Sequence, residues 1–256
     1  MNEFAIASLA SLLAGLATFI GALPVLVTHK LSQRWVAGLL GFGGGVMLAA
    51  TAFSLIVPGT EAAIGLGYSK AGAATIMAIG IALGGLFLAL AHRFFPHEHF
   101  FKGCDGCNTR NLARIWLFIT AITLHNFPEG LAVGVSFGGG PSEGITTAVG
   151  IGLQNMPEGL VVAVALTAER YAAGFALGVS LLTGLVEPIG GLVGIGLIAL
   201  TRSILPWAMA FAAGAMLFVI CDEIIPESHQ RGQEREGTIG IMLGFIIMML
   251  LDISLG

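Results

Sequence analysis

Charged residues are scarce in this chain of 256 residues. Asp, Glu, Lys and Arg make up only 10% of it, against roughly 25% in an ordinary soluble domain, whereas hydrophobic residues make up 56%. So few charges cannot cover the surface of a globular protein of 26.4 kDa. The composition therefore predicts an integral membrane protein that lies in a lipid bilayer, and it excludes intrinsic disorder and a cytosolic enzyme.

Cysteines and basic residues are also few. The three cysteines cannot form a disulfide framework, and the 11 Lys and Arg residues are scattered, which gives no indication of a nucleic-acid partner. The N-terminus carries Glu3 and no basic segment before its first apolar run. This pattern argues against a cleaved signal peptide and predicts that the first run spans the membrane.

Apolar runs divide the chain into eight segments that are long enough to cross a membrane. A helix needs about 20 apolar residues to cross roughly 30 Å of hydrocarbon. The runs are continuously apolar and do not alternate with period two, which excludes a β-barrel. We predict an all-α fold with one transmembrane domain over residues 1–256 and a polar cytoplasmic loop at about 93–113. The predicted spans are about 4–27, 35–57, 71–92, 113–137, 144–168, 172–198, 204–225 and 238–255.

The charges of the loops predict the orientation of these spans. An even number of spans puts both termini on one side of the membrane. Nine of the 11 basic residues fall in the loops after the first, third, fifth and seventh spans, and only Lys70 and Arg202 lie on the other side. Because basic residues gather in cytoplasmic loops, we predict that both termini are extracytoplasmic.

Two consecutive spans carry the same polar motif, [HQ]-N-x-P-E-G. It reads HNFPEG at 125–130 in the fourth span and QNMPEG at 154–159 in the fifth. Polar residues are costly inside a membrane and mark functional sites there. At 1.5 Å per residue, both motifs lie about 15–18 Å deep, near the midplane, so they can meet.

The spacing within each motif puts its polar side chains on one helix face. Residues at i, i+3 and i+4 are neighbours on a helix. The six side chains are His125, Asn126, Glu129, Gln154, Asn155 and Glu158. A third carboxylate, Glu187, lies at a similar depth in the sixth span. An imidazole, carboxylates and amides together predict a site for divalent cations, and without metal the carboxylates should bind protons instead.

Each motif also contains a proline, at Pro128 and Pro157. A proline has no N–H, so the carbonyls of Leu124 and Leu153 lose their usual helical donors. Such a local break in the hydrogen bonding can kink the helix, and it opens backbone oxygen to a cation or water.

Together with the segment GLVEPIGG around Glu187, the two motifs resemble those of the ZIP (Zrt/Irt-like protein) family of divalent metal-ion transporters, nearest its short bacterial, GufA-like branch. The resemblance covers the whole chain. It implies eight helices in a 3+2+3 arrangement, spanning the bacterial plasma (inner) membrane, and it allows a homodimer.

The resemblance further implies a binuclear metal site. The first position would use His125, Glu129, Gln154 and Glu158, with the thioether of Met47. The second would use Asn126, Asn155 and Glu187, with Glu129 and Glu158 bridging both metals. Some family members carry an acidic residue or a histidine where this chain has Asn155, so the neutral amide here lowers the negative charge of the second position.

Ligand chemistry and resemblance lead to one functional prediction, the uptake of a divalent transition metal, foremost Zn²⁺, into the cytoplasm. The same nitrogen and carboxylate ligands suit Cd²⁺, Fe²⁺, Mn²⁺, Co²⁺ and Ni²⁺. A metal-gated channel could use these ligands equally well. An intramembrane metalloenzyme is a further alternative, but the chain has no HExxH motif, and we expect no enzymatic activity.

Other polar groups have two interpretations each. Each motif amide, taken singly, could serve only to form a hydrogen bond between helices, and Met47 could be an ordinary packed core residue. The segments 221–223 and 227–229 could collect an ion that leaves the site, or form a solvated helix end. Asp252 could guide cations inward or mark the membrane interface. A weak metal site in the cytoplasmic loop is indicated by four residues, His97, His99, Cys104 and Cys107.

Overall fold

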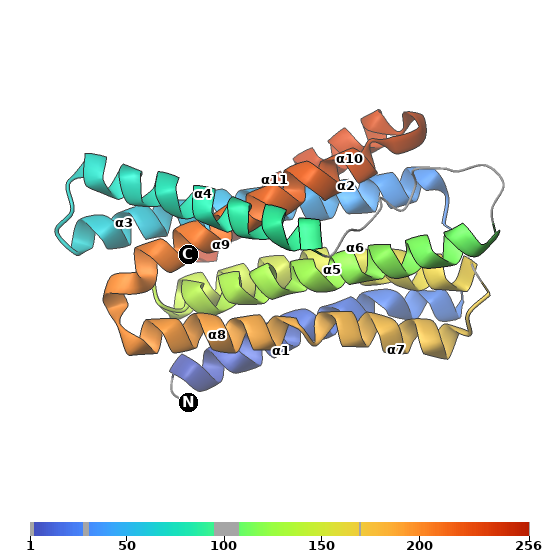
Figure 1. Ribbon diagram of the computed structural model, residues 1–256, viewed down its shortest axis with the longest axis horizontal. Helices are drawn as coiled ribbons and strands as arrows, with labels where there is room; N and C mark the ends of the chain where they lie inside the picture. Colours follow the sequence, from blue (N-terminus) through green and yellow to red (C-terminus); the bar gives the residue numbers. More distant parts are fainter. Residues whose placement is uncertain (1–2, 28–30, 95–107, 169, 256) are drawn as a thin grey trace.

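The computed structural model describes residues 3–27, 31–94, 108–168 and 170–255 (Figure 1). Within these ranges the chain forms helices and no strand, which confirms the all-α prediction. Seven helical segments are long and apolar enough to cross a membrane. The helix α5 (Asn108–Ser136) is not one of the seven, although its 29 residues exceed the length of a span. The count of eight spans therefore stays a prediction.

The predicted spans correspond to helices whose ends differ from the expected ones. The second span continues past residue 57, because a π-helical segment joins its two α-helices. The elements of the first three spans are α1 (Glu3–Ala22), η1 (Leu23–Leu26), α2 (Gln33–Ala49), η2 (Ala50–Ile56), α3 (Val57–Gly65) and α4 (Lys70–Phe94). The loop residues His97, His99, Cys104 and Cys107 lie outside the described residues.

The remaining spans begin with α5, which starts inside the region predicted as the polar loop. The sixth span is divided into two helices, and the seventh contains a second π-helical segment. The elements are α6 (Pro141–Ala168), α7 (Ala173–Gly184), α8 (Glu187–Leu200), η3 (Arg202–Ile204), α9 (Leu205–Val219), η4 (Ile220–Ile224), α10 (Ile225–Ser228), η5 (Gln230–Gly232) and α11 (Glu234–Leu255).

Three prolines in the central helices have different effects. Helical structure continues through Pro128 in α5 and Pro157 in α6, so neither proline ends its helix. A helix break occurs before Pro188, between α7 and α8. The ring of a proline clashes with the carbonyl four residues earlier, which is that of Gly184, the last residue of α7. The break therefore lies directly beside Glu187.

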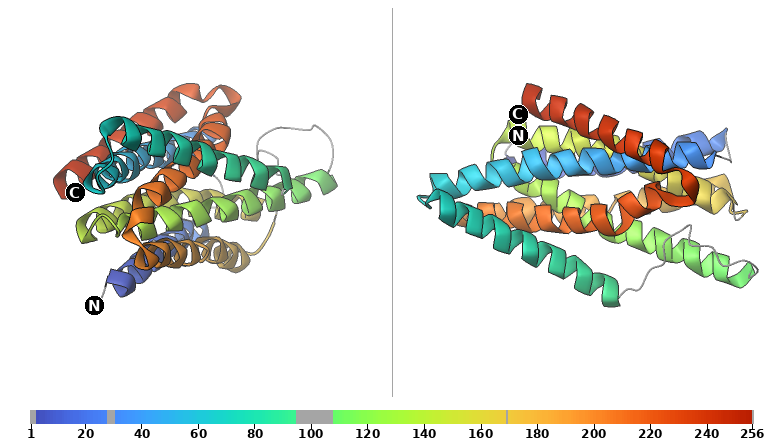
Figure 2. Two further views of the ribbon diagram at one scale, coloured as in Figure 1. Left: turned by 60° about the vertical axis from the view of Figure 1, so that its left-hand side comes forward. Right: turned by 90° about the horizontal axis from the view of Figure 1, so that it is seen from above.

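The two motif helices lie in the interior of the bundle. In Figure 1, α5 and α6 run between α1, α7 and α8 on one side and α2, α4, α9 and α11 on the other. The closest packing joins α1 to α6, α5 to α8, α2 to α11 and α4 to α9. Figures 1 and 2 place both termini toward the same end of the bundle, as an even number of crossings requires.

The structure reveals an internal repeat in the sequence that relates the first three spans to the last three. Residues 11–23 read SLLAGLATFIGAL and residues 180–192 read SLLTGLVEPIGGL. Residues 79–84 in α4 read IGIALG, and residues 239–244 in α11 read IGIMLG. Both α2 and α9 lead into a π-helical segment that is followed by a proline, Pro58 or Pro226. Thus α1, α2 and α4 correspond to α7–α8, α9 and α11.

The repeat specifies equivalent close contacts between helices. A Cβ atom on Gly84 in α4 would overlap the carbonyl oxygen of Phe211 in α9. At the equivalent place, a Cβ atom on Gly244 in α11 would overlap the carbonyl oxygen of Phe42 in α2. Small residues of this kind let membrane helices approach closely, where van der Waals packing drives their association. The same local sequence therefore produces the same packing in both halves.

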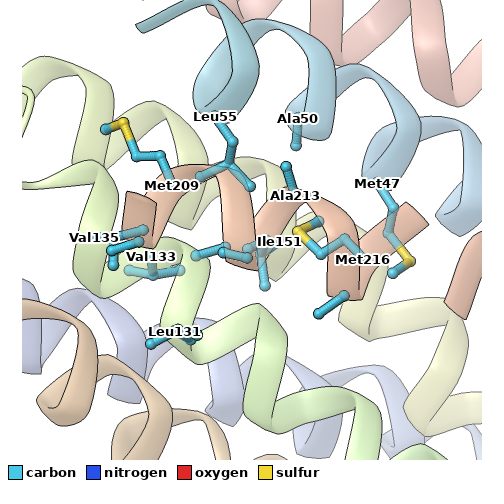
Figure 3. Close-up of a cluster of buried hydrophobic side chains, with 14 of the residues drawn as sticks. Met47, Ala50, Leu55, Leu131, Val133, Val135, Ile151, Met209, Ala213 and Met216 are labelled. Atoms are coloured by element: carbon cyan, nitrogen blue, oxygen red, sulfur yellow. The ribbon is translucent and has the colours of Figure 1, made fainter. Parts of the chain in front are cut away.

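Hydrophobic side chains fill the space between the motif helices and α2 and α9. Figure 3 shows this cluster, in which Met47 and Leu55 from α2 and η2 meet Ile151 from α6 and Met209 and Met216 from α9. All five side chains are buried. A second cluster includes Val25, Leu40, Val162 and Leu166. The polar motif residues lie between helices that are otherwise packed through apolar side chains.

We predict that Gly84→Ala destabilises the protein by about 1–3 kcal/mol, because the new methyl group must push α4 away from α9. Thermal unfolding in detergent measures the effect. The matched control is Gly178→Ala in α7, where no atom lies within 4 Å of the new Cβ and the better helix propensity of alanine should slightly raise stability. Equal melting temperatures of the two variants would contradict the close-contact account.

Candidate metal centre

Seven polar side chains predicted as ligands are buried in the middle of the bundle. His125 is 2% exposed and Glu158 is 4% exposed, and the other five have no exposed surface. These five are Asn126, Glu129, Gln154, Asn155 and Glu187. The sequence contains no Lys or Arg between residues 115 and 169, so α5 from Ile115 onward and the whole of α6 offer neither residue as a partner for the three carboxylates. Buried carboxylates of this kind need hydrogen-bond donors, protons or cations.

The two glutamates of the motifs share one donor. The amide Nε2 of Gln154 donates to Oε1 of Glu129 at 2.7 Å and lies 3.3 Å from Oε1 of Glu158. Since Gln154 and Glu158 are i and i+4 on α6, their spacing brings both to the face that meets Glu129 on α5. The structure thus joins the two motifs, as their depth predicted.

Asn155 connects α6 to two further helices. Its Nδ2 atom donates to Oε1 of Glu187 at the start of α8 and to the backbone carbonyl of Ala14 in α1 at 2.9 Å. The carboxylate of Glu187 is therefore held against α6. The role of α1 was not predicted, since Ala14 contributes only a backbone oxygen, which leaves no signal in the identity of the residue.

His125 contacts Glu223, a residue for which the sequence allows two interpretations, ion collection or a solvated helix end. Its Nε2 atom lies 3.0 Å from Oε1 of Glu223 in the π-helical segment η4. Glu223 is 8% exposed, which is incompatible with a solvated helix end. The available signal was its place directly before Ile224 and Ile225 and about one turn before Pro226, whereas the preceding Cys221 and Asp222 are exposed.

Asn126 and Met47 differ from the rest of the predicted set. Both polar atoms of the Asn126 side chain are buried without a hydrogen-bond partner. Met47 is buried in the main hydrophobic cluster, where Figure 3 shows it on α2, in the cluster that also contains Met216. Packing accounts for the position of Met47, and its role as a ligand stays a prediction.

Unpartnered oxygen atoms remain at the centre of the site. One carboxylate oxygen each of Glu129, Glu158 and Glu187, and the amide oxygen of Gln154, are buried without a hydrogen-bond partner. In the described ranges no three His, Cys, Asp or Glu side chains are grouped closely enough to hold a metal ion. The Gln154 amide nitrogen lies between the two motif carboxylates, in a position that a cation would need. The free oxygens are the hard ligands that divalent cations accept.

The groups nearer the two ends of the bundle make local contacts. His229 contacts the hydroxyl of Thr238 in α11 at 3.2 Å, and Glu227 accepts a hydrogen bond from Gln230 at 2.7 Å. At the other end, Asp252 accepts a hydrogen bond of 2.6 Å from Ser54 in η2. Asp252 therefore joins α11 to the π-helical segment η2. This contact is compatible with both roles predicted for it, guiding cations inward or marking the membrane interface.

Comparison with known proteins gives consistent matches. Residues 101–252 match the family model described as ZIP Zinc transporter. The chain is 51% identical to the zinc transporter GufA of Myxococcus xanthus, over 96% of this chain and 98% of that protein. It is 44% identical to the zinc transporter ZIPB of Bordetella bronchiseptica, over 94% and 78% of the two chains. It is 33% identical to the zinc transporter ZIP11 of Homo sapiens, over 93% and 94%.

We predict that Asn155→Leu destabilises the metal-free protein more than Asn126→Leu does. Both asparagines have no exposed surface, but only Asn155 bonds a carboxylate and a backbone carbonyl, which its loss would leave buried without a donor. The expected difference is about 1–3 kcal/mol in the free energy of unfolding. Denaturation in detergent with a chelator measures it, and equal losses would show that the Asn155 contacts do not stabilise the fold.

Proposed function

Because the chain belongs to the ZIP zinc transporter family, we propose that it carries Zn²⁺ across a membrane into the cytoplasm through the buried polar site between α5, α6 and α8. Its relatives are zinc transporters and not enzymes, which leaves the metalloenzyme alternative without support. The substrate, the direction and the two-metal site are parts of the proposal. So are the bacterial inner membrane, the extracytoplasmic termini and a homodimer.

The observation that carries the proposal is the set of three buried carboxylates, with no Lys or Arg in the sequence between residues 115 and 169. In the proposed site, His125, Glu129, Gln154 and Glu158, with Met47, hold one cation. Asn126, Asn155 and Glu187 hold the other, and Glu129 and Glu158 bridge the two. Three carboxylates neutralise most of the charge of two divalent ions, so each buried negative charge would be paired with a cation.

Cation binding requires a change at Gln154. Its amide nitrogen, which now lies between the carboxylates of Glu129 and Glu158, cannot ligate a metal, whereas its unpartnered oxygen can. Rotation of the amide by half a turn exchanges the two atoms. A metal would then replace the amide hydrogen as the partner of both carboxylates.

The burial of the site favours a carrier over a channel. All seven polar ligands are at most 4% exposed, so a cation could not pass the site without movement of the surrounding helices. Alternate exposure of a mid-membrane site to the two sides is the usual mechanism of secondary transporters. A channel would instead give single-channel currents. Its metal flux would not saturate at the low turnover rates that are typical of a carrier.

The proposal is tested by uptake of radioactive zinc into sealed proteoliposomes, with Fe²⁺, Mn²⁺, Cd²⁺, Co²⁺ and Ni²⁺ as competitors. Saturable uptake is expected, and the competition ranks the substrates. If zinc binds to the purified protein but never crosses the bilayer, the transporter proposal fails.

We predict that Glu129→Ala and Glu158→Ala each abolish zinc uptake, because each carboxylate is proposed to bridge both metals. The expected loss is at least about a hundredfold, since removing a charged partner from a buried site costs about 3–5 kcal/mol. Glu61→Ala, at an exposed carboxylate of α3, is the matched control and should transport normally. Normal uptake by either site variant would refute the bridging role.

We predict that Asn155→Asp increases zinc retention, because it adds a fourth carboxylate beside Glu187. Equilibrium dialysis with zinc measures the affinity, which should rise about tenfold or more. Tighter retention should also slow release into the cytoplasm and lower the maximal uptake rate. Unchanged affinity would mean that residue 155 is not a ligand.

A further inference from the structure

The internal repeat places Thr18 in α1 at the position equivalent to Glu187 at the start of α8. In both segments the residue comes three positions after a glycine, Gly15 or Gly184, within the shared pattern SLLxGL. The two glycines pack against each other: a Cβ on Gly15 would lie 3.4 Å from the Cβ of Glu187, and a Cβ on Gly184 would lie 2.9 Å from the hydroxyl of Thr18. The equivalence in sequence is therefore an equivalence in space.

The motif helices repeat this relation. A Cβ on Gly130, the last residue of the first motif, would overlap the backbone of Glu187. A Cβ on Gly159, the last residue of the second motif, would overlap the backbone of Thr18. The first motif thus lies against Glu187 and the second against Thr18. A pseudo-twofold relation exchanges α5 with α6 and α8 with α1.

The two halves differ in their hydrogen bonds. On one side, Asn155 donates to the carboxylate of Glu187. On the equivalent side, the side-chain amide of Asn126 and the hydroxyl of Thr18 are both buried without a partner, and neither residue has any exposed surface. Thr18 is shorter than a glutamate by about two bonds, so its hydroxyl cannot reach as far as the carboxylate of Glu187 does.

The orientation of the Thr18 hydroxyl is unusual in this protein. Most helical threonines of the described chain donate to the carbonyl three or four residues earlier, as Thr51, Thr123 and Thr147 do. For Thr18 that carbonyl belongs to Ala14, and it accepts a hydrogen bond from Asn155 instead. The hydroxyl of Thr18 is therefore left to serve another partner.

We propose that the hydroxyl of Thr18 and the amide nitrogen of Asn126 form a neutral half-site that binds a water molecule of the divalent cation in the central site, while the amide oxygen of Asn126 remains free to ligate that cation. A buried water needs two to four polar partners. The hydroxyl, the amide and the cation together supply three. The half-site is the counterpart of Asn155 and Glu187 and lets the cation keep one water where the other half gives it a carboxylate. This inference rests on the proposed function of the site.

The test compares zinc affinity and zinc uptake among variants of the full chain. Thr18→Val keeps the shape and removes the hydroxyl, and we expect both quantities to fall about tenfold. Thr18→Ser restores a hydroxyl and should recover uptake relative to the valine variant. The control is Thr146→Val in α6, which also removes a buried, unpartnered hydroxyl but lies eight residues, or about 12 Å, from Gln154.

A double variant tests whether the two residues hold the same water. If they do, Thr18→Val added to Asn126→Leu causes no further loss beyond that of Asn126→Leu alone. The half-site would be overturned if the losses of zinc affinity and uptake in the two single variants multiplied in the double variant. It would also be overturned if Thr18→Val showed the same affinity and uptake as Thr146→Val. Should Thr18→Val fail to fold, Thr18→Ala against Thr18→Ser makes the same comparison.

Wild type and Glu129→Ala, measured beside these variants, separate the two proposals. If wild type takes up no zinc, the proposed function fails, and this inference fails with it. If wild type takes up zinc and Glu129→Ala does not, an unchanged Thr18→Val variant refutes the half-site alone.

Discussion

The structure depends on the burial of three carboxylates in a bundle whose motif helices contain no lysine or arginine between residues 115 and 168. Glu129, Glu158 and Glu187 cannot be solvated in this position, and burying them without partners would cost several kcal/mol. The amides of Gln154 and Asn155 meet part of the need by donating to all three. One oxygen of each carboxylate remains unpartnered, so amides alone do not satisfy the site. A divalent cation is the partner that would complete it.

Such a site requires helices that approach closely, because short amide and carboxylate side chains must bridge them. The glycine that ends each motif provides this approach: Gly130 lies against the backbone of Glu187, and Gly159 lies against that of Thr18. Glycine is therefore as much a part of the motif as its ligands are. The helix break before Pro188 has a related effect, since it frees Glu187 to begin α8 beside Asn155.

The fold class and the meeting of the two motifs were predictable from sequence, because hydropathy and the i, i+4 spacing are local properties. Glu223 was not assigned to the site, since its contact with His125 depends on how α9 and η4 pack against α5, which no local pattern encodes. Helical structure continues through Pro128 and Pro157, because a long helix tolerates one missing hydrogen bond, whereas the helix break before Pro188 was not predicted. The repeat of SLLxGL was visible in the sequence, but its meaning emerged only from the packing of Gly15 against Gly184.

The repeat generates two equivalent half-sites, and the chain makes them chemically different. His125 corresponds to Gln154 in the motifs, and Thr18 corresponds to Glu187 in the flanking helices. A fully symmetric centre with a second glutamate at position 18 would contain four carboxylates, and the added charge would repel the others unless a proton or a more tightly held cation offset it. The proposed carrier would have to release its cargo, so excess negative charge would work against transport. The neutral Thr18 side chain keeps the packing of the repeat while limiting the charge of the site to three carboxylates.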